Sequence, residues 1–231
     1  MSESNKRNFI VHGSILAIAG ILVRIIGMLY RIPVVNIIGS EGNGIYGAAF
    51  NIYNIMLVLS SYGLPMAVSK LVSARFTKKR YKSAAKVLRC SLMVAVCTGG
   101  IAALLVFFGA SFIENVIYGG GLPGLAVPLR ILAPTIFLVA ILGVIRGFFQ
   151  GQSTMIPTAV SQILEQIVNA IVSIAAGYGM MKAFASLPDV AAYGAAGSTL
   201  GTAMGALTAV LFMGFLYAVY TPTFNRLKRK D

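Results

Sequence analysis

Charged residues, and acidic residues above all, are scarce in this sequence. Only 11% of its 231 residues are charged and only six are Asp or Glu, whereas 58% are hydrophobic. Water-soluble domains carry about a quarter charged residues, so this chain lacks the charge needed to cover a globular surface. The composition therefore excludes an ordinary soluble domain and predicts a protein embedded in a lipid bilayer.

The sequence also lacks the residue sets on which most enzyme sites depend. Its two cysteines, Cys90 and Cys97, lie in one apolar run, so we expect small buried side chains on one helix face rather than a disulfide scaffold. The chain has one histidine and no phosphate-binding loop, His-Glu-x-x-His motif or Gly-x-Ser-x-Gly motif. We therefore expect no enzyme activity, no catalytic residue, no metal site and no cofactor.

Six apolar runs are long enough to cross a bilayer as helices, because a hydrocarbon core of about 30 Å needs roughly 20 helical residues. The runs do not alternate apolar and polar residues as the strands of a membrane barrel do. We therefore predict an all-α, polytopic membrane protein built as a six-transmembrane-helix bundle. The predicted spans are residues 9–32, 44–64, 90–113, 125–149, 157–181 and 193–220.

Lysine and arginine outnumber acidic residues by 19 to 6 and gather between alternate spans. Positive charge is enriched in cytoplasmic loops, and six spans place nearly all of the basic clusters on one side. We therefore predict that both termini are cytoplasmic and that the basic stretch from Lys70 to Arg89 sets topology rather than binding nucleic acid. A cleaved signal peptide is a rival interpretation of the first span, but its apolar run continues too far for one.

The bilayer penalises polar side chains, so the polar residues of the first two spans are functional candidates. Arg24 lies near the middle of the first span and shares one face with Arg31 and several glycines, which favours a cationic cavity wall over a structural arginine bonded to carbonyls or an acid. In the second span, Asn51 and Asn54 either serve as hydrogen-bond glue between helices or bind a sugar or pyrophosphate. The candidate substrate-binding residues are thus Arg24, Arg31, Asn51 and Asn54.

A polar segment joins the fourth and fifth spans. Arg146 closes the fourth span, and Pro157 suits the first turn of the fifth. Glu165 lies two turns into the fifth span, on a polar stripe, and we expect Arg146 to be its counter-charge. The pair either locks two helices at an inner gate or holds an ion-sensing carboxylate. The candidate gate residues are Arg146, Gln162, Glu165 and Gln166; Asn169 and Ser173 continue the stripe.

Glycine recurs at four-residue intervals in the sixth span, at positions 197, 201 and 205. Small residues at this spacing let two helix backbones approach closely. We therefore expect this face to pack against a neighbouring helix, and we assign it no ligand.

Three blocks carry a resemblance to a known family: residues 24–33 (Arg-Ile-Ile-Gly-Met-Leu-Tyr-Arg-Ile-Pro), residues 62–71 (Tyr-Gly-Leu-Pro-Met-Ala-Val-Ser-Lys-Leu) and the segment 146–166. The chain resembles the polysaccharide-transporter branch of the MOP exporter superfamily, in particular the Gram-positive group that includes stage V sporulation protein B and MurJ-type lipid II flippases. The resemblance covers essentially the whole chain.

The resemblance implies a bacterial cytoplasmic-membrane transporter with two helical lobes around a central cavity, which flips undecaprenyl-pyrophosphate-linked sugars by alternating access. The chain matches the N-terminal lobe, over residues 1–225, with 226–231 as the start of a cytoplasmic linker. The implied partners are a lipid-linked oligosaccharide, the bilayer and a missing C-terminal lobe on the same or a separate chain. Arg24 matches an arginine on the first helix of lipid II flippases, whereas Asn51 and Asn54 stand on the helix where those proteins carry another arginine.

Two other functions stay open. A cation-coupled multidrug exporter of the same superfamily would favour acidic residues in the cavity, and Glu165 alone is available within a span. A non-transporting membrane scaffold, or a degenerate fragment, would use the glycine-rich faces to bind partners. The resemblance and the arginine-bearing face favour the flippase over both.

Overall fold

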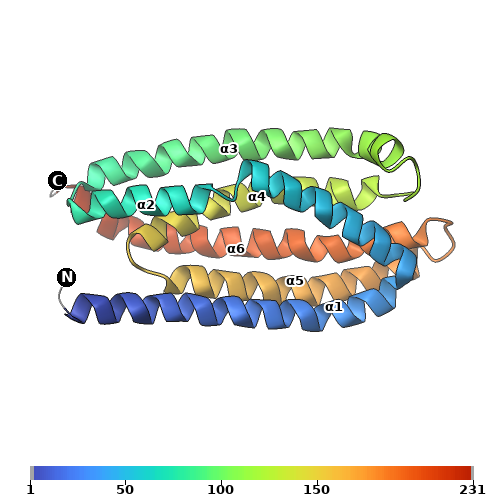
Figure 1. Cartoon of the computed structure of the whole chain (residues 1–231), viewed down its shortest axis with the longest axis horizontal. Coiled ribbons are helices and arrows are strands. Elements are labelled where there is room, and N and C mark those ends of the chain that lie inside the picture. The colour runs from blue at the N-terminus through green and yellow to red at the C-terminus, as the bar shows by residue number, and fades with distance from the viewer. Residues whose placement is uncertain (1–2, 230–231) are drawn as a thin grey trace.

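The structure, a computed structural model, describes the backbone of residues 3–229 and the side chains of residues 13–229. This part of the chain is almost entirely helical and holds no strand, and its helices lie side by side along one long axis (Figure 1). The all-α membrane bundle expected from the sequence is confirmed. The elements are α1 (Glu3–Ser60), α2 (Leu64–Thr77), α3 (Tyr81–Phe112), the π-helical turn η1 (Ile113–Ile117), α4 (Ala126–Gly151), α5 (Ile156–Ala183) and α6 (Val190–Lys228).

The helix α1 contains two of the predicted spans. Its 58 residues would extend about 87 Å if straight, nearly three times the hydrocarbon core. The helix breaks at Gly39, whose φ of 71° and ψ of −175° are open essentially only to glycine. Figure 1 shows the chain folding back there. Within the described chain, five helices are long and apolar enough to cross a membrane, whereas the sequence predicted six spans; the first two predicted spans both lie in α1. The break at Gly39 divides α1 into a first arm (residues 3–38) and a second arm (40–60).

The basic stretch between the second and third predicted spans is helical, contrary to our expectation of a loop. α2 occupies Leu64–Thr77, and α3 begins at Tyr81 rather than at Cys90. The reason is that the span prediction counted apolar residues, whereas Lys82, Lys86 and Arg89 recur on one exposed helix face and let α3 extend beyond the apolar run.

Large apolar side chains cover the outside of the bundle. Along α3, Met93, Leu104 and Phe108 are all more than half exposed. Soluble proteins rarely expose so extensive an apolar surface, whereas lipid chains would cover it. Cys90 and Cys97 lie on this outer surface as well and are exposed, so our expectation that they are buried is wrong. α3 buries a different face, which carries small residues such as Ala95 and Ala102.

The ends of the helices agree in part with the predicted spans. Pro157 lies in the first turn of α5, as expected. α6 continues to Lys228, so residues 226–228, which we assigned to a linker, are helical; residues 230 and 231 lie outside the described residues. The division into a lobe and a linker stays a prediction.

Glycines hold α5 and α6 together. A Cβ atom at Gly201 would lie 2.5 Å from the backbone oxygen of Asn169, and one at Gly205 would lie 2.6 Å from the backbone oxygen of Glu165. Real side chains do not approach so closely, so only glycine fits at these positions. The close packing predicted from the glycine repeat is confirmed, and it places the α5 residues of the candidate site directly against α6.

Replacing Gly201 with alanine tests this seam. We expect Gly201→Ala to destabilise the protein by about 1–3 kcal/mol, because the methyl group would force α5 and α6 apart. Gly214→Ala is the matched control on the same helix, since a Cβ there meets nothing within 4 Å. Thermal unfolding in detergent measures both variants; equal melting temperatures would contradict the glycine seam.

Candidate functional site

An ion pair joins α4 to α5 inside the bundle. Arg146 Nη2 lies 2.7 Å from Glu165 Oε2, and Arg146 Nε donates a hydrogen bond of 2.9 Å to Ser161 Oγ. The Arg146 and Glu165 side chains are 14% and 26% exposed, so water reaches both without surrounding them. Ser161, itself fully buried, donates to the carbonyl oxygen of Thr158 at 2.8 Å. The contact expected from the sequence is therefore present, and it fixes the start of α5 against the end of α4.

The polar stripe of α5 continues into a hydrogen-bonded network. Asn169 lies one turn beyond Glu165 and is buried; its amide nitrogen donates to the Tyr30 hydroxyl at 3.4 Å. Ser173 Oγ lies 2.9 Å from Asn169 Oδ1 and 2.8 Å from the carbonyl oxygen of Ser198 on α6. The stripe thus connects the first arm of α1, α5 and α6.

Two contacts fix the relative height of the first arm and α5. Tyr30 contacts Asn169, and a Cβ atom at Gly27 would lie 3.3 Å from Gln166 Nε2. Both pairs are 139 residues apart in the sequence, so the two helices run parallel in register. The same offset places Arg24 level with position 163, between Gln162 and Glu165. Both glutamines are half-buried beside this level.

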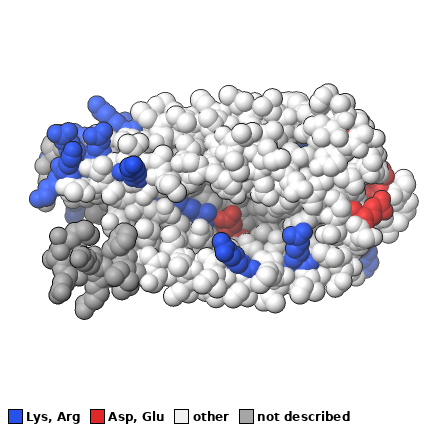
Figure 2. All heavy atoms as spheres, viewed as in Figure 1, with Lys and Arg blue, Asp and Glu red and all other residues white. Residues whose placement is uncertain are grey.

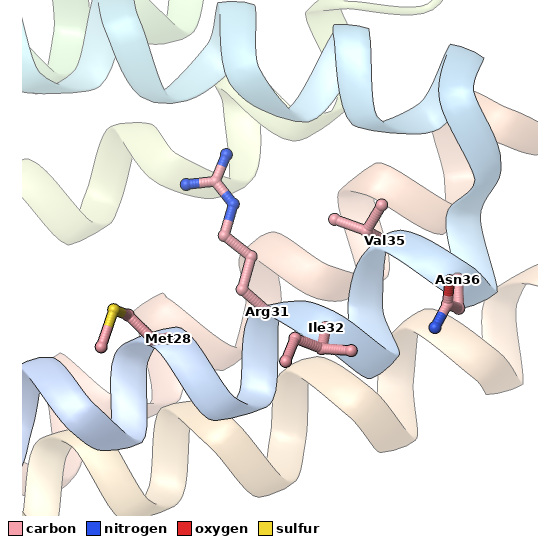
Figure 3. Close-up of a pocket in the computed structure, with 5 residues that line it drawn as sticks. All are labelled: Met28, Arg31, Ile32, Val35 and Asn36. Atoms are coloured by element: carbon pink, nitrogen blue, oxygen red, sulfur yellow. The ribbon is translucent and has the colours of Figure 1, made fainter.

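Arg31 lines an open pocket on the first arm. The pocket has a volume of about 420 Å³, and its lining residues are Met28, Arg31, Ile32, Val35 and Asn36. Figure 3 shows the Arg31 side chain pointing from the first arm into the space between the two arms of α1. Its guanidinium carbon lies 6.0 Å from the ring centre of Tyr46 on the second arm, at the limit of a cation–π contact.

The other candidate substrate-binding residues lie outside this pocket. Arg24 is exposed and makes no ion pair or hydrogen bond with residues 13–229. Asn51 and Asn54 are exposed on the second arm, and neither has a hydrogen bond with another described residue. Within the described chain, neither amide therefore forms a hydrogen bond between two helices. The structure does not gather the four candidates into one closed site.

Charge is distributed unevenly over the bundle. Figure 2 shows basic atoms gathered at the end that holds the α2–α3 turn and acidic atoms at the opposite end. A hollow runs along the middle of the same face, and basic and acidic atoms meet inside it. Within the described residues, no cluster of three His, Cys, Asp or Glu side chains could hold a metal ion. The hollow therefore brings basic and acidic groups together between apolar outer surfaces.

Sequence reasoning missed several contacts in this region. Tyr46 and Tyr53 are buried on the second arm, and both rings contact the ring of Phe50. Their spacing of seven residues, with Phe50 between them, is the signal that marks one helix face. At the acidic end, Glu114 accepts hydrogen bonds from the backbone nitrogens of Gly124 (3.0 Å) and Ala126 (2.7 Å) and so caps α4.

Comparison with known proteins decides the family. The family described as polysaccharide biosynthesis protein matches residues 10–231. The chain belongs to this family. It is 34% identical over 176 residues to the protein named lipid II flippase MurJ of Bacillus subtilis, which is 74% of this chain and 32% of that one. It is 31% identical over 209 residues to stage V sporulation protein B of the same organism, or 90% of this chain and 39% of that one.

A third relative from Bacillus subtilis, an uncharacterized membrane protein named YabM, is 30% identical over 213 residues, which is 92% of this chain and 38% of that protein. The chain therefore spans about a third to two fifths of the length of the curated relatives it matches. No solved structure matches the chain. These findings place the chain in the polysaccharide-transporter and MurJ-like part of the MOP exporter superfamily, a group of membrane transporters.

The Arg146–Glu165 pair can be tested by breaking it from one side. We expect Arg146→Leu to destabilise the protein by about 2 kcal/mol, because it leaves a carboxylate partly buried without a partner. The double variant Arg146→Leu, Glu165→Leu should recover part of that loss, since no unpaired charge remains. Thermal unfolding in detergent of these two variants and of Glu165→Leu alone gives the coupling; additive effects would show that the two charges do not interact.

Proposed function

We propose that this chain forms the N-terminal lobe of a transporter that flips undecaprenyl-pyrophosphate-linked sugars across the bacterial cytoplasmic membrane by alternating access. The substrate is a lipid-linked oligosaccharide, either lipid II or a polysaccharide repeat unit. A second lobe, on the same or a separate chain, would close the other side of the hollow. The guanidinium of Arg24, which is exposed and unpaired within residues 13–229, carries this proposal, and family membership supports it.

The charge of Arg24 gives the physical argument. An arginine near the middle of a bilayer costs about 2.5–3.5 kcal/mol on insertion scales unless a partner or water compensates it. The nearest acid in height, Glu165, already pairs with Arg146. Arg24 therefore needs water or an anion from outside the lobe. A pyrophosphate supplies that anion, and Arg31 adds a second cation two turns away on the same helix.

The Arg146–Glu165 pair fits the role of an inner gate in this cycle. It joins α4 and α5 close to the basic end of the bundle, where Gln162 and Gln166 flank it. Breaking the pair would free the start of α5 from α4, while the glycine seam keeps α5 on α6. Cation-coupled drug export is less well supported, because the acid that it would use is occupied by Arg146.

The proposed orientation places the basic end of the bundle in the cytoplasm, as positive charge favours. Trypsin should then cut the α2–α3 turn at Lys78–Arg80 in inside-out vesicles and spare it in right-side-out vesicles. Lys182, exposed at the opposite end, is the matched control and should show the reverse pattern. Cleavage at the turn in right-side-out vesicles would contradict a cytoplasmic basic end.

Arg24→Ala tests the transport proposal. In a flipping assay on the full-length parent protein in vesicles with defined lipid-linked sugars, we expect the rate to fall at least tenfold, with membrane insertion unchanged. Arg130→Ala is the matched control, since this arginine bonds Ser111 at 2.8 Å near the acidic end, away from the hollow. Transport that survives Arg24→Ala would remove the basis for substrate capture in this lobe.

A further inference from the structure

Exposed cations cover the end of the bundle that holds the α2–α3 turn (Figure 2). Lys70 lies on α2, the run from Lys78 to Arg80 forms the turn, and Arg226 lies near the end of α6; all of them are exposed. Of the four acids whose side chains the structure describes, three lie at the opposite end and the fourth, Glu165, pairs with Arg146. The described part of the chain therefore places no acid beside these cations.

Aromatic contacts hold the helices of this basic end together. The rings of Phe76, at the end of α2, and Phe224, on α6, are stacked with their centres 6.1 Å apart. Phe148 on α4 meets both rings edge-on, at 6.4 Å and 5.4 Å. Lys228 Nζ lies 5.1 Å from the centre of the Phe224 ring, within the range of a cation–π contact. The cations of the turn and of α6 therefore belong to one packed surface rather than to separate loops.

Lys79 occupies a backbone position that favours glycine. Its φ is 55°, in the left-handed region. The backbone nitrogens of Lys79 and Arg80 donate hydrogen bonds of 2.9 Å to the carbonyl oxygens of Phe76 and Arg75, the pair of bonds that ends a helix with a left-handed residue. Glycine is the usual residue there, because a side chain is strained in this conformation. The tip of the turn thus carries a charge where the backbone alone would favour glycine.

The exposed surface changes from basic to apolar within about one helical turn. On α3, Lys86 and Arg89 are exposed, and Met93, the next residue on the same face, is 61% exposed. On α2, Lys70 lies one turn from Met66, which is 78% exposed. A turn spans about 5.4 Å, so an anion at the cations would lie beside side chains that face hydrocarbon. This arrangement matches a phospholipid, whose charged headgroup and acyl chains are joined, better than a soluble polyanion.

We propose that the α2–α3 turn, together with Lys70 and the end of α6, is a binding surface for the headgroups of anionic phospholipids in the leaflet that the basic end meets. Lysine and arginine near an anionic membrane surface attract it, and the attraction falls off within a Debye length. Bound headgroups would hold the ends of α2, α3 and α6 at a fixed depth. This surface is distinct from Arg24 and Arg31, so the inference does not depend on the proposed transport.

Phosphatidylglycerol tests this surface, and phosphatidylcholine with the same acyl chains is the neutral probe. The whole chain in nonionic detergent is titrated with each lipid, and the melting temperature gives the affinity, because a ligand that binds only the folded chain stabilises it. We expect a saturable rise with phosphatidylglycerol and almost none with phosphatidylcholine. Replacing Lys78, Lys79 and Arg80 together with glutamine should weaken phosphatidylglycerol binding at least about thirtyfold, since each cation contributes roughly a factor of five.

The backbone of Lys79 allows a sharper variant. Lys79→Gly removes the charge and relieves the strain, so without lipid it should be at least as stable as the wild type, while phosphatidylglycerol affinity falls about fivefold. Ser153→Gly is the matched control, because Ser153 is the other described non-glycine residue with a positive φ, 62°. It should also keep its stability and should keep the wild-type affinity. A turn with a purely structural role would not separate these two measurements.

Two further variants locate the bound lipid. Lys182→Gln removes an exposed cation at the opposite end, and Arg24→Ala removes the cation of the proposed transport site. Both should retain the affinity for phosphatidylglycerol that the triple glutamine variant loses. If Arg24→Ala loses the affinity and the triple variant keeps it, the lipid binds in the hollow; this result would overturn the inference and leave the proposed function intact.

Three other results would also overturn the inference. One is an equal response to phosphatidylglycerol and phosphatidylcholine, which would show that the headgroup charge is not recognised. Another is the same rise with inorganic phosphate at equal concentration, which would show that the acyl chains play no part. The third is an RNA oligonucleotide that displaces phosphatidylglycerol at equal phosphate concentration, which would make the turn a nucleic-acid surface.

Discussion

The arrangement of this bundle depends on how charge is compensated inside a bilayer. Arg146 and Glu165 compensate each other at 2.7 Å, and Ser161 takes a further guanidinium hydrogen bond. That contact fixes the start of α5 against the end of α4. Arg24 lies at nearly the same height and is left without an acid. Because Glu165 compensates Arg146 within the lobe, Arg24 depends on water or on an anion from outside.

Glycine makes this arrangement of polar groups possible. Gly201 and Gly205 bring α6 against the backbone of Asn169 and Glu165. The contact between α5 and α6 therefore needs no long side chains to fill it. Gly27 plays the same part on the first arm: because it has no side chain, the Gln166 amide can lie against the helix there. With α5 held closely on two sides, its polar stripe has defined neighbours. A looser seam would let the carboxylate of Glu165 rotate away from Arg146.

The sequence was sufficient for the features that follow from composition and periodicity. Apolar runs predicted the helices, Pro157 marked the start of α5, and the charges of Arg146 and Glu165 predicted their contact. It was insufficient where the outcome depends on tertiary position. Hydropathy cannot distinguish a helix that leaves the membrane from a loop, so α2 was missed. Nor can it distinguish lipid-facing from core positions, so Cys90 was placed inside, and the contact of Arg31 with Tyr46 requires the fold at Gly39.

The exposed surface of the first arm combines arginines with apolar side chains. Arg24 and Arg31 border a stripe of exposed apolar residues that includes Ile21, Ile25 and Met28. A hydrocarbon chain can lie along such a stripe without dehydrating polar groups, while its charged end stays beside the guanidinium groups in the hollow. A soluble anion would gain only the electrostatic part of this interaction. If the proposed function holds, the first arm therefore favours a phosphate that is joined to a lipid over one that is free.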